Sequence, residues 1–222
     1  LSNLDENQAH DACQKAERNY QGLADELTKQ RQSIAIELAK NMTVSIQALG
    51  MQHALFFINI KQGDPSKRGS DQCQFLMSTN PGQMPQSLKE TLSGGELSRV
   101  GLALQEHCPS NMKPIQLLDE VDVGISGHVA EQVAYLLFKR SKKHQIIAIS
   151  HLPQMAMMAD QHGYISKNVV EDQARIGFKW LNSKERIDAL AELLAGKKIN
   201  QAAKEHAKEL LFSANQEKEA LV

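Results

Sequence analysis

Two short clusters in this 222-residue sequence carry side chains suited to binding phosphate and a divalent cation. The first is the segment SGGE at residues 93–96, which stands directly before apolar residues at helical spacing. Ser93 and Glu96 can form a capping box, in which each side chain bonds the backbone N–H of the other. A helix N-terminus carries partial positive charge, and glycines let an anion approach it. The segment therefore predicts a capped helix, and Gly94 and Gly95 favour a phosphate site there.

The second cluster consists of Asp119, Glu120 and His151, which each follow a short apolar run, at 115–118 and at 145–150. A helical pattern lies between the runs, so the spacing predicts a βαβ unit with parallel strands. Ligands bind beyond the carboxyl ends of such strands. There an Asp can hold Mg²⁺, a Glu can orient or deprotonate water, and a His can contact phosphate. Each residue alone fits a surface turn or a structural histidine; together they favour phosphoryl transfer.

The elements that must position these residues begin with a long helix. Residues 1–49 contain no proline and one glycine, and their apolar residues recur mostly at steps of three and four. This pattern predicts either a coiled-coil arm or a long amphipathic helix packed on its own domain. The apolar positions are Ala9, Ala12, Ala16, Tyr20, Leu23, Leu27, Ile34, Leu38 and Met42.

Two hairpins and several helices are expected in the rest of the chain. Strands at 54–60 and 73–78 are predicted to pair across a polar loop at 61–72. We expect Trp180 to lie in the core. The remaining predicted elements are helices at 127–143, 153–159, 183–196 and about 200–211, and a second hairpin made of 164–170 and 175–181.

Composition limits the function classes. A net charge of −1 and a pI near 6.8 argue against strong sequence-independent DNA binding by this chain alone. The three cysteines, Cys13, Cys73 and Cys108, form no C-x-x-C pair, which favours plain thiols over a disulfide framework or zinc site. No apolar run approaches the ~20 residues of a membrane helix, and no signal peptide is recognisable. These features predict a cytoplasmic location and no membrane partner.

Taken in order, the motifs resemble the C-terminal half of an ATP-binding-cassette (ABC) ATPase head. LSGGE at 92–96 matches the signature motif, and IQLLDE at 115–120 matches Walker B, although Gln116 is unusually polar for that strand. Asp122 falls at the D-loop aspartate and His151 at the switch histidine. The segments FLMSTNPGQ, LSGGELSRVGLALQ, DEVDVGISG and SHLPQMA together resemble the RecN family of bacterial DNA repair proteins, over nearly the whole chain.

This resemblance implies the α/β fold of the C-terminal lobe of an ABC/SMC-type P-loop NTPase head. Such a lobe has a parallel βαβ core with β-hairpins and helices. We expect two domains, a returning coiled-coil arm helix at 1–49 and the lobe at 50–222. The P-loop motif G-x-x-x-x-G-K-[ST] of the family is not found in this sequence, which opens at Leu1 without a Met. We therefore expect a fragment that starts within a longer protein.

The resemblance also implies a function, an SMC-like ATPase in recombinational repair of DNA double-strand breaks. ATP and Mg²⁺ would lie between two heads of a homodimer, each nucleotide covered by the signature of the opposite head. The implied partners are the N-terminal P-loop half of the same protein, the second head and DNA, in the bacterial cytoplasm at the nucleoid. The chain alone is expected to be inactive. The alternatives are the head half of another SMC or ABC-type ATPase, or a non-catalytic coiled-coil dimerisation module.

The resemblance also points to roles for particular residues. Glu120 would act on the attacking water and His151 on the γ-phosphate, while Asp119 would serve Mg²⁺ directly or through water. Asp122 would sense the partner site across the dimer. Arg99, one turn into the signature helix, is interpreted either as a relay of dimer closure or as a surface arginine. The signature residues that would contact nucleotide in trans are Ser93, Gly94, Gly95 and Glu96.

Overall fold

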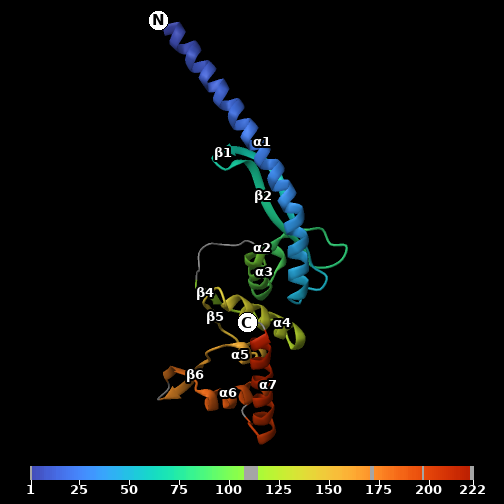
Figure 1. Cartoon of the computed structure of the whole chain (residues 1–222), viewed down its shortest axis with the longest axis vertical. Helices are drawn as coiled ribbons and strands as arrows, with labels where there is room; N and C mark the ends of the chain where they lie inside the picture. Colours follow the sequence, from blue (N-terminus) through green and yellow to red (C-terminus); the bar gives the residue numbers. More distant parts are fainter. Residues whose placement is uncertain (1, 108–114, 171–172, 197, 221–222) are drawn as a thin grey trace. The chain divides into compact units, whose positions relative to one another are not determined.

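The computed structural model describes residues 2–107, 115–170, 173–196 and 198–220. Cys108 therefore lies outside the described residues. The chain divides into two compact units (Figure 1), each described here by itself. The first, which we call the arm unit, comprises Leu1–Gln47, Met51–Leu92 and Ala103–His107; the second, the lobe unit, comprises Ala48–Gly50, Ser93–Leu102 and Cys108–Val222. No helix in the described part of the chain combines the length and apolarity needed to cross a membrane.

Helix α1 (Ser2–Ala48) is continuous, as predicted from the absence of proline. Its second half packs on its own unit, since Ala35 and Met42 are buried there. Leu23 and Ile34 of the predicted seam are instead 69% and 63% exposed. The packed-helix interpretation therefore holds for the second half of α1, and the coiled-coil arm stays a prediction.

Strands β1 (Leu55–Ser66) and β2 (Gly69–Ser78) form an antiparallel hairpin along α1 (Figure 1), and the short β3 (Gln86–Ser87) pairs with β2. The predicted polar loop at 61–72 was wrong, because both strands continue through it. Contacts with α1 explain the difference. The backbone N–H of Ser66 donates to the Tyr20 hydroxyl (3.0 Å), and Asp71 accepts from Thr28 and Arg31 (both 2.9 Å).

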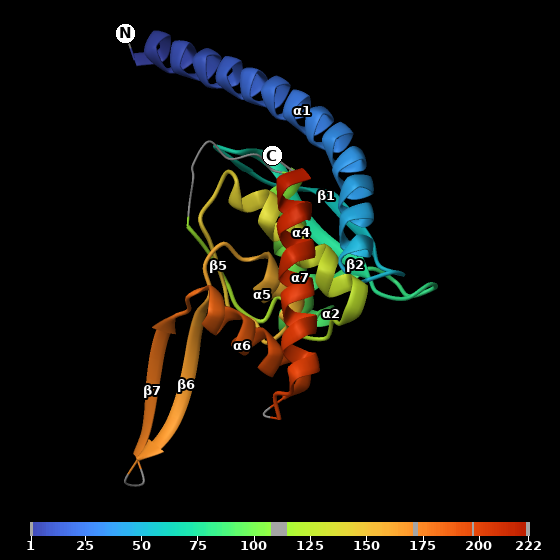
Figure 2. The same ribbon diagram turned by 60° about the horizontal axis from the view of Figure 1, so that its bottom comes forward.

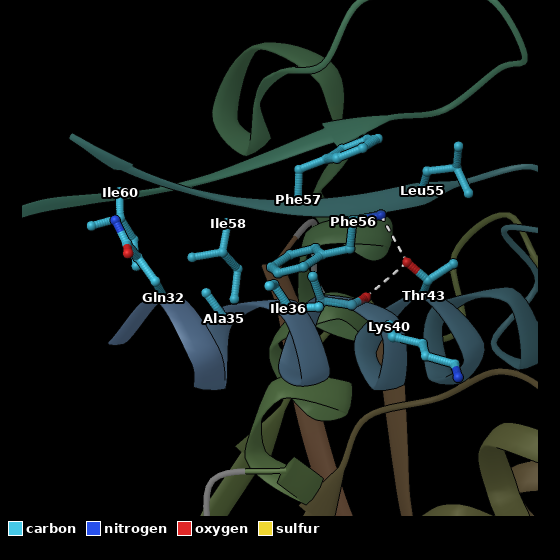
Figure 3. A pocket seen from close by; sticks show the side chains of 11 residues that line it. Gln32, Ala35, Ile36, Lys40, Thr43, Leu55, Phe56, Phe57, Ile58 and Ile60 are labelled. Carbon is cyan, nitrogen blue, oxygen red and sulfur yellow. Dashed lines mark hydrogen bonds between the residues drawn. The ribbon is translucent and has the colours of Figure 1, made fainter. Parts of the chain in front are cut away.

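A groove of about 660 Å³ lies between α1 and β1, lined mostly by apolar side chains. Figure 3 shows Phe56 and Ile58 of β1 facing α1 near Ala35 and Ile36. The Thr43 hydroxyl accepts from the backbone N–H of Phe56 (3.0 Å), which fixes the strand on the helix. None of the candidate site residues lines this groove.

The lobe unit contains the predicted βαβ unit. Strands β4 (Gln116–Leu118) and β5 (Ile146–Ala148) are parallel, and helix α4 (Gly127–Ser141) connects them. Gln116 is buried, and its side-chain oxygen accepts from Arg140 Nε (3.0 Å), which explains how a polar residue is tolerated in this strand. The prediction of parallel strands with their carboxyl ends at one edge is confirmed.

The rest of the lobe unit follows the second strand. Helix α5 (Pro153–Met158) leads into the hairpin of β6 (Gly163–Val170) and β7 (Gln173–Trp180), followed by α6 (Ser183–Ala195) and α7 (Gln201–Ala220). Figure 2 shows these elements, and the hairpin projects from the helices. Trp180 is 62% exposed, so the prediction that it lies in the core was wrong.

Helix α7 extends well past its predicted end near residue 211. Ala214 in the extension is buried, and Lys218 donates to the backbone oxygen of Ala159 just after α5 (3.0 Å). Arg186 of α6 donates to the same oxygen (2.6 Å). Two cations thus hold the C-terminal end of α5, where backbone carbonyls carry partial negative charge.

Candidate functional site

The start of α3 (Gly94–His107) forms the predicted capping box. The Glu96 carboxylate accepts from the Ser93 backbone N–H (2.9 Å) and hydroxyl (2.7 Å), and the Glu96 N–H donates to Ser93 Oγ (3.4 Å). Burial alone would raise the pKa of Glu96, but the Ser93 hydrogen bonds and the Arg99 charge outweigh it and lower the pKa. The carboxylate therefore stays ionised and committed to the cap.

The two glycines of this segment have different surroundings. Gly94 is exposed, and a Cβ placed there would lie 2.8 Å from Glu120 Oε2. Gly95 is buried, and its Cβ would lie 2.9 Å from the Glu120 backbone oxygen and 3.0 Å from that of Val123. At Gly95 the close approach is thus made by the chain's own backbone. Ser93 and Gly94 are the exposed residues of the corner.

The acidic pair follows β4. Asp119 and Glu120 are both exposed, and Asp119 Oδ1 accepts from the Glu120 backbone N–H (3.0 Å). Glu120 has φ +57°, and no other non-glycine residue of the described part of the chain has a positive φ. Such a conformation costs about 1–3 kcal/mol and persists only when neighbouring structure enforces it. The strain thus falls on the residue predicted to act on water.

Arg99 connects the signature helix to the turn after Glu120. Its side chain is 3% exposed, and Nη1 donates to the backbone oxygens of Val121 (3.3 Å) and Val123 (2.8 Å). Burial lowers the pKa of Arg99, and the charge of Glu96 raises it in part. The surface-arginine interpretation was therefore wrong. Arg99 holds the start of α3 against the turn after Glu120.

Asp122 is buried, and its role across a dimer stays a prediction. Its side chain is 3% exposed, and Oδ2 accepts from Ser150 Oγ (2.5 Å) and the His151 backbone N–H (3.1 Å). The same oxygen lies 3.3 Å from His151 Nδ1. The structure directs this carboxylate into its own chain, toward His151. The sequence interpretation missed Ser150, whose only signal was its place directly before His151.

The structure thus brings the candidate site residues of the lobe unit together in two separate sets. The signature corner contacts the Glu120 turn, and Asp122 contacts His151. Both groups follow or face the carboxyl ends of β4 and β5. Exposed hydrogen-bonding groups and an imidazole at such an edge suit a polyphosphate, and the two carboxylates suit the divalent cation that accompanies it.

The carboxylates fit a magnesium ion. Mg²⁺ takes one or two protein carboxylates and completes its shell with water and phosphate oxygens. Asp119 and Glu120 offer such a donor set, exposed at a strand end. Within the described residues, no group of three or more His, Cys, Asp or Glu side chains is placed to hold a metal ion.

Comparison with known proteins identifies what the chain resembles. No family model matches it. It is 40% identical over 196 residues to the DNA repair protein RecN of Rickettsia conorii, and 38% identical over 200 residues to that of Haemophilus influenzae. The matches cover 88% and 89% of this chain. The chain is a RecN-like segment. It spans 36% of the length of each of these relatives.

Solved structures give the fold. The Smc head domain with a coiled coil and joint from Pyrococcus yayanosii superposes with a TM-score of 0.52 at 20% identity. The likeness covers 85% of this chain and 36% of that one. The fold is therefore that of part of an Smc head, as the RecN resemblance predicted.

Proposed function

We propose that this chain is the C-terminal part of a RecN-like, SMC-type ATPase that acts in DNA double-strand break repair. It supplies the signature motif, the Walker B carboxylates and the switch histidine of an ATP site formed between two heads. The observation that carries the proposal is the placement of Asp119 and Glu120 after β4 and of His151 after the adjacent parallel strand β5.

In the proposed mechanism each residue has one task. Asp119 holds Mg²⁺, directly or through water, and Glu120 orients or deprotonates the attacking water. His151 contacts the γ-phosphate. Ser93 and Gly94, exposed at the N-terminus of α3, face the nucleotide of the opposite head, where the helix end favours negative charge. Mg²⁺, when bound, neutralises charge on the phosphates.

The P-loop is proposed to come from another part of the polypeptide. One face of the β4–β5 pair is apolar and exposed: Leu117 is 69% exposed and its paired neighbour Ile147 is 48% exposed. Parallel sheets are ordinarily covered on both faces. Ile115 and Ile149 extend this face, at 64% and 50% exposure. We infer that the N-terminal P-loop half covers it and completes the head.

Helix α1 is proposed as the returning arm of such a protein, and DNA and a second head as its further partners. In the first half of α1, Ala9, Ala12 and Ala16 of the predicted seam are exposed. A small-residue seam of this kind suits close packing against an antiparallel helix.

The test is reconstitution. This chain alone should not hydrolyse ATP, whereas co-expression with a P-loop-bearing segment should give Mg²⁺-dependent ATPase activity. Glu120→Gln should abolish turnover but retain ATP binding in the assembled head. Robust activity of the chain alone, or normal turnover of the Glu120→Gln protein, would refute the proposal.

A further inference from the structure

The environment of Asp122 distinguishes it from the other carboxylates of the site. Asp119 and Glu120 are exposed, whereas the Asp122 side chain is 3% exposed. A buried carboxylate needs hydrogen-bond donors, because burial removes the water that would otherwise solvate its charge. Its donors come from Ser150 and His151, at the carboxyl end of the neighbouring strand β5.

Two hydrogen bonds hold one oxygen of Asp122, and a ring nitrogen of His151 lies beside it. Ser150 Oγ at 2.5 Å and the His151 N–H at 3.1 Å fix Asp122 Oδ2 against the backbone that carries His151. His151 Nδ1 lies 3.3 Å from the same oxygen. An ionised carboxylate only accepts hydrogen bonds, so the ring can join this arrangement only with a proton on Nδ1.

The rest of the ring faces outward, since the His151 side chain is 72% exposed. With Nδ1 turned to Asp122, Nε2 is the nitrogen left for a ligand. The hydrogen bond made by one ring nitrogen sets the protonation and direction of the other.

We propose that Asp122 is a positioning residue that fixes the orientation and tautomer of His151, so that Nε2 faces the nucleotide phosphate. The placement of Nε2 toward a nucleotide phosphate rests on the proposed function, whereas the tautomer of His151 does not. In the neutral ring Nε2 only accepts, so a hydrogen bond to a phosphate oxygen forms in the charged ring, where Nε2 donates and Asp122 balances the charge.

The tautomer can be measured directly on this chain. Two-bond ¹H–¹⁵N correlation spectra of ¹⁵N-histidine-labelled protein, recorded at about pH 8 where an ordinary histidine is neutral, separate Nδ1–H from Nε2–H rings. We expect His151, assigned with His151→Gln, to be in the Nδ1–H form. The exposed His53 serves as the reference for an unrestrained ring. An Nε2–H ring, or the same average as His53, would overturn the proposal.

Variants separate positioning from simple folding. Asp122→Ala should return His151 to the spectrum of an unrestrained ring. Ser150→Ala removes a donor to the same oxygen but keeps the ring contact, so His151 should stay in the Nδ1–H form. If Asp122→Ala does not fold, the spectra of the wild type and of Ser150→Ala still show whether His151 is held in the Nδ1–H form. An unchanged tautomer in a folded Asp122→Ala protein would contradict the proposal.

Kinetics in the reconstituted ATPase give the second measurement. Asp122→Ala and His151→Ala should lower kcat by a similar factor, and the double variant should be no slower than His151→Ala, because the two act as one unit. Additive losses would count against positioning. If the wild-type assembly shows no ATPase, the proposed function fails while the tautomer result stands.

Discussion

Replacing Gly95 by Ala tests whether close contact with the chain's own backbone is the reason that position 95 requires a glycine. The added Cβ would lie 2.9 Å from the Glu120 oxygen, 3.0 Å from the Val123 oxygen and 3.1 Å from Val123 Cβ. Two of these atoms belong to the backbone, so no side chain can rotate away. Overpacking of this kind costs about 1–3 kcal/mol.

Gly101 on the same helix is the matched control, because a Cβ there meets nothing within 4 Å. Gly101→Ala should stabilise the protein by about 0.4–1 kcal/mol through lost freedom of the unfolded chain. Gly95→Ala gains the same amount from the unfolded chain, so this gain cancels between the two variants. Their free energies of unfolding should therefore differ by about 1–3 kcal/mol, the overpacking cost at Gly95.

The single tryptophan provides the assay. Trp180 lies in the lobe unit, as does Gly95, so urea unfolding followed by tryptophan fluorescence reports on the correct unit. We expect a lower midpoint for Gly95→Ala than for wild type and a higher one for Gly101→Ala. Equal midpoints for the two variants would refute the contact between Gly95 and the Glu120 turn.

Three further variants test other parts of the structure. Arg99→Met should destabilise the lobe unit by about 2–4 kcal/mol, because it loses two charge-assisted hydrogen bonds but no longer carries the cost of burying the guanidinium. Arg99→Lys should lose less stability. An unchanged urea midpoint for Arg99→Met would show that the bonds to Val121 and Val123 are absent. Glu120→Gly should stabilise by about 0.5–1 kcal/mol by relieving the positive φ, whereas Glu120→Ala, which keeps the strain, should not; a gain in both would exclude backbone strain as the cause. The pKa of Asp71 is lowered, mainly by the hydrogen bond from Arg31. Burial acts in the opposite direction, and the hydrogen bond from Thr28 lowers the pKa further. Its contribution to stability is thus complete above the ordinary Asp pKa and is lost as pH falls through the lower folded value. Asp71→Asn should accordingly unfold earlier than wild type at neutral pH, by far-UV circular dichroism, and the gap should close in acid; a constant gap would contradict this pairing.

The parts of the fold that the sequence predicted are those set by local pattern. The βαβ unit followed from two short apolar runs around a helical segment, and the capping box from Ser93 and Glu96 alone. Because β4 and β5 are parallel, the placement of Asp119 and His151 at one sheet edge followed as well.

The parts that the sequence did not predict depend on partners distant in the chain. Polar residues such as Asp71 favour a loop locally, yet α1 supplies Thr28 and Arg31 and the strand continues. The carbonyl partners of Arg99 lie more than twenty residues further along, so nothing near it indicates burial. Asp122 was assigned by motif position, which does not reveal the direction of its side chain.

We propose that each ATP site combines the carboxylates of one head with the signature of another. Mixing two inactive reconstituted heads, one with Ser93→Arg and one with Glu120→Gln, tests this arrangement. If the signature acts in trans, a mixed dimer contains one site with both elements intact, and mixing should restore part of the wild-type ATPase activity. If mixing restores none while each variant still binds ATP and dimers exchange, the signature and the carboxylates serve the same head, contrary to the account.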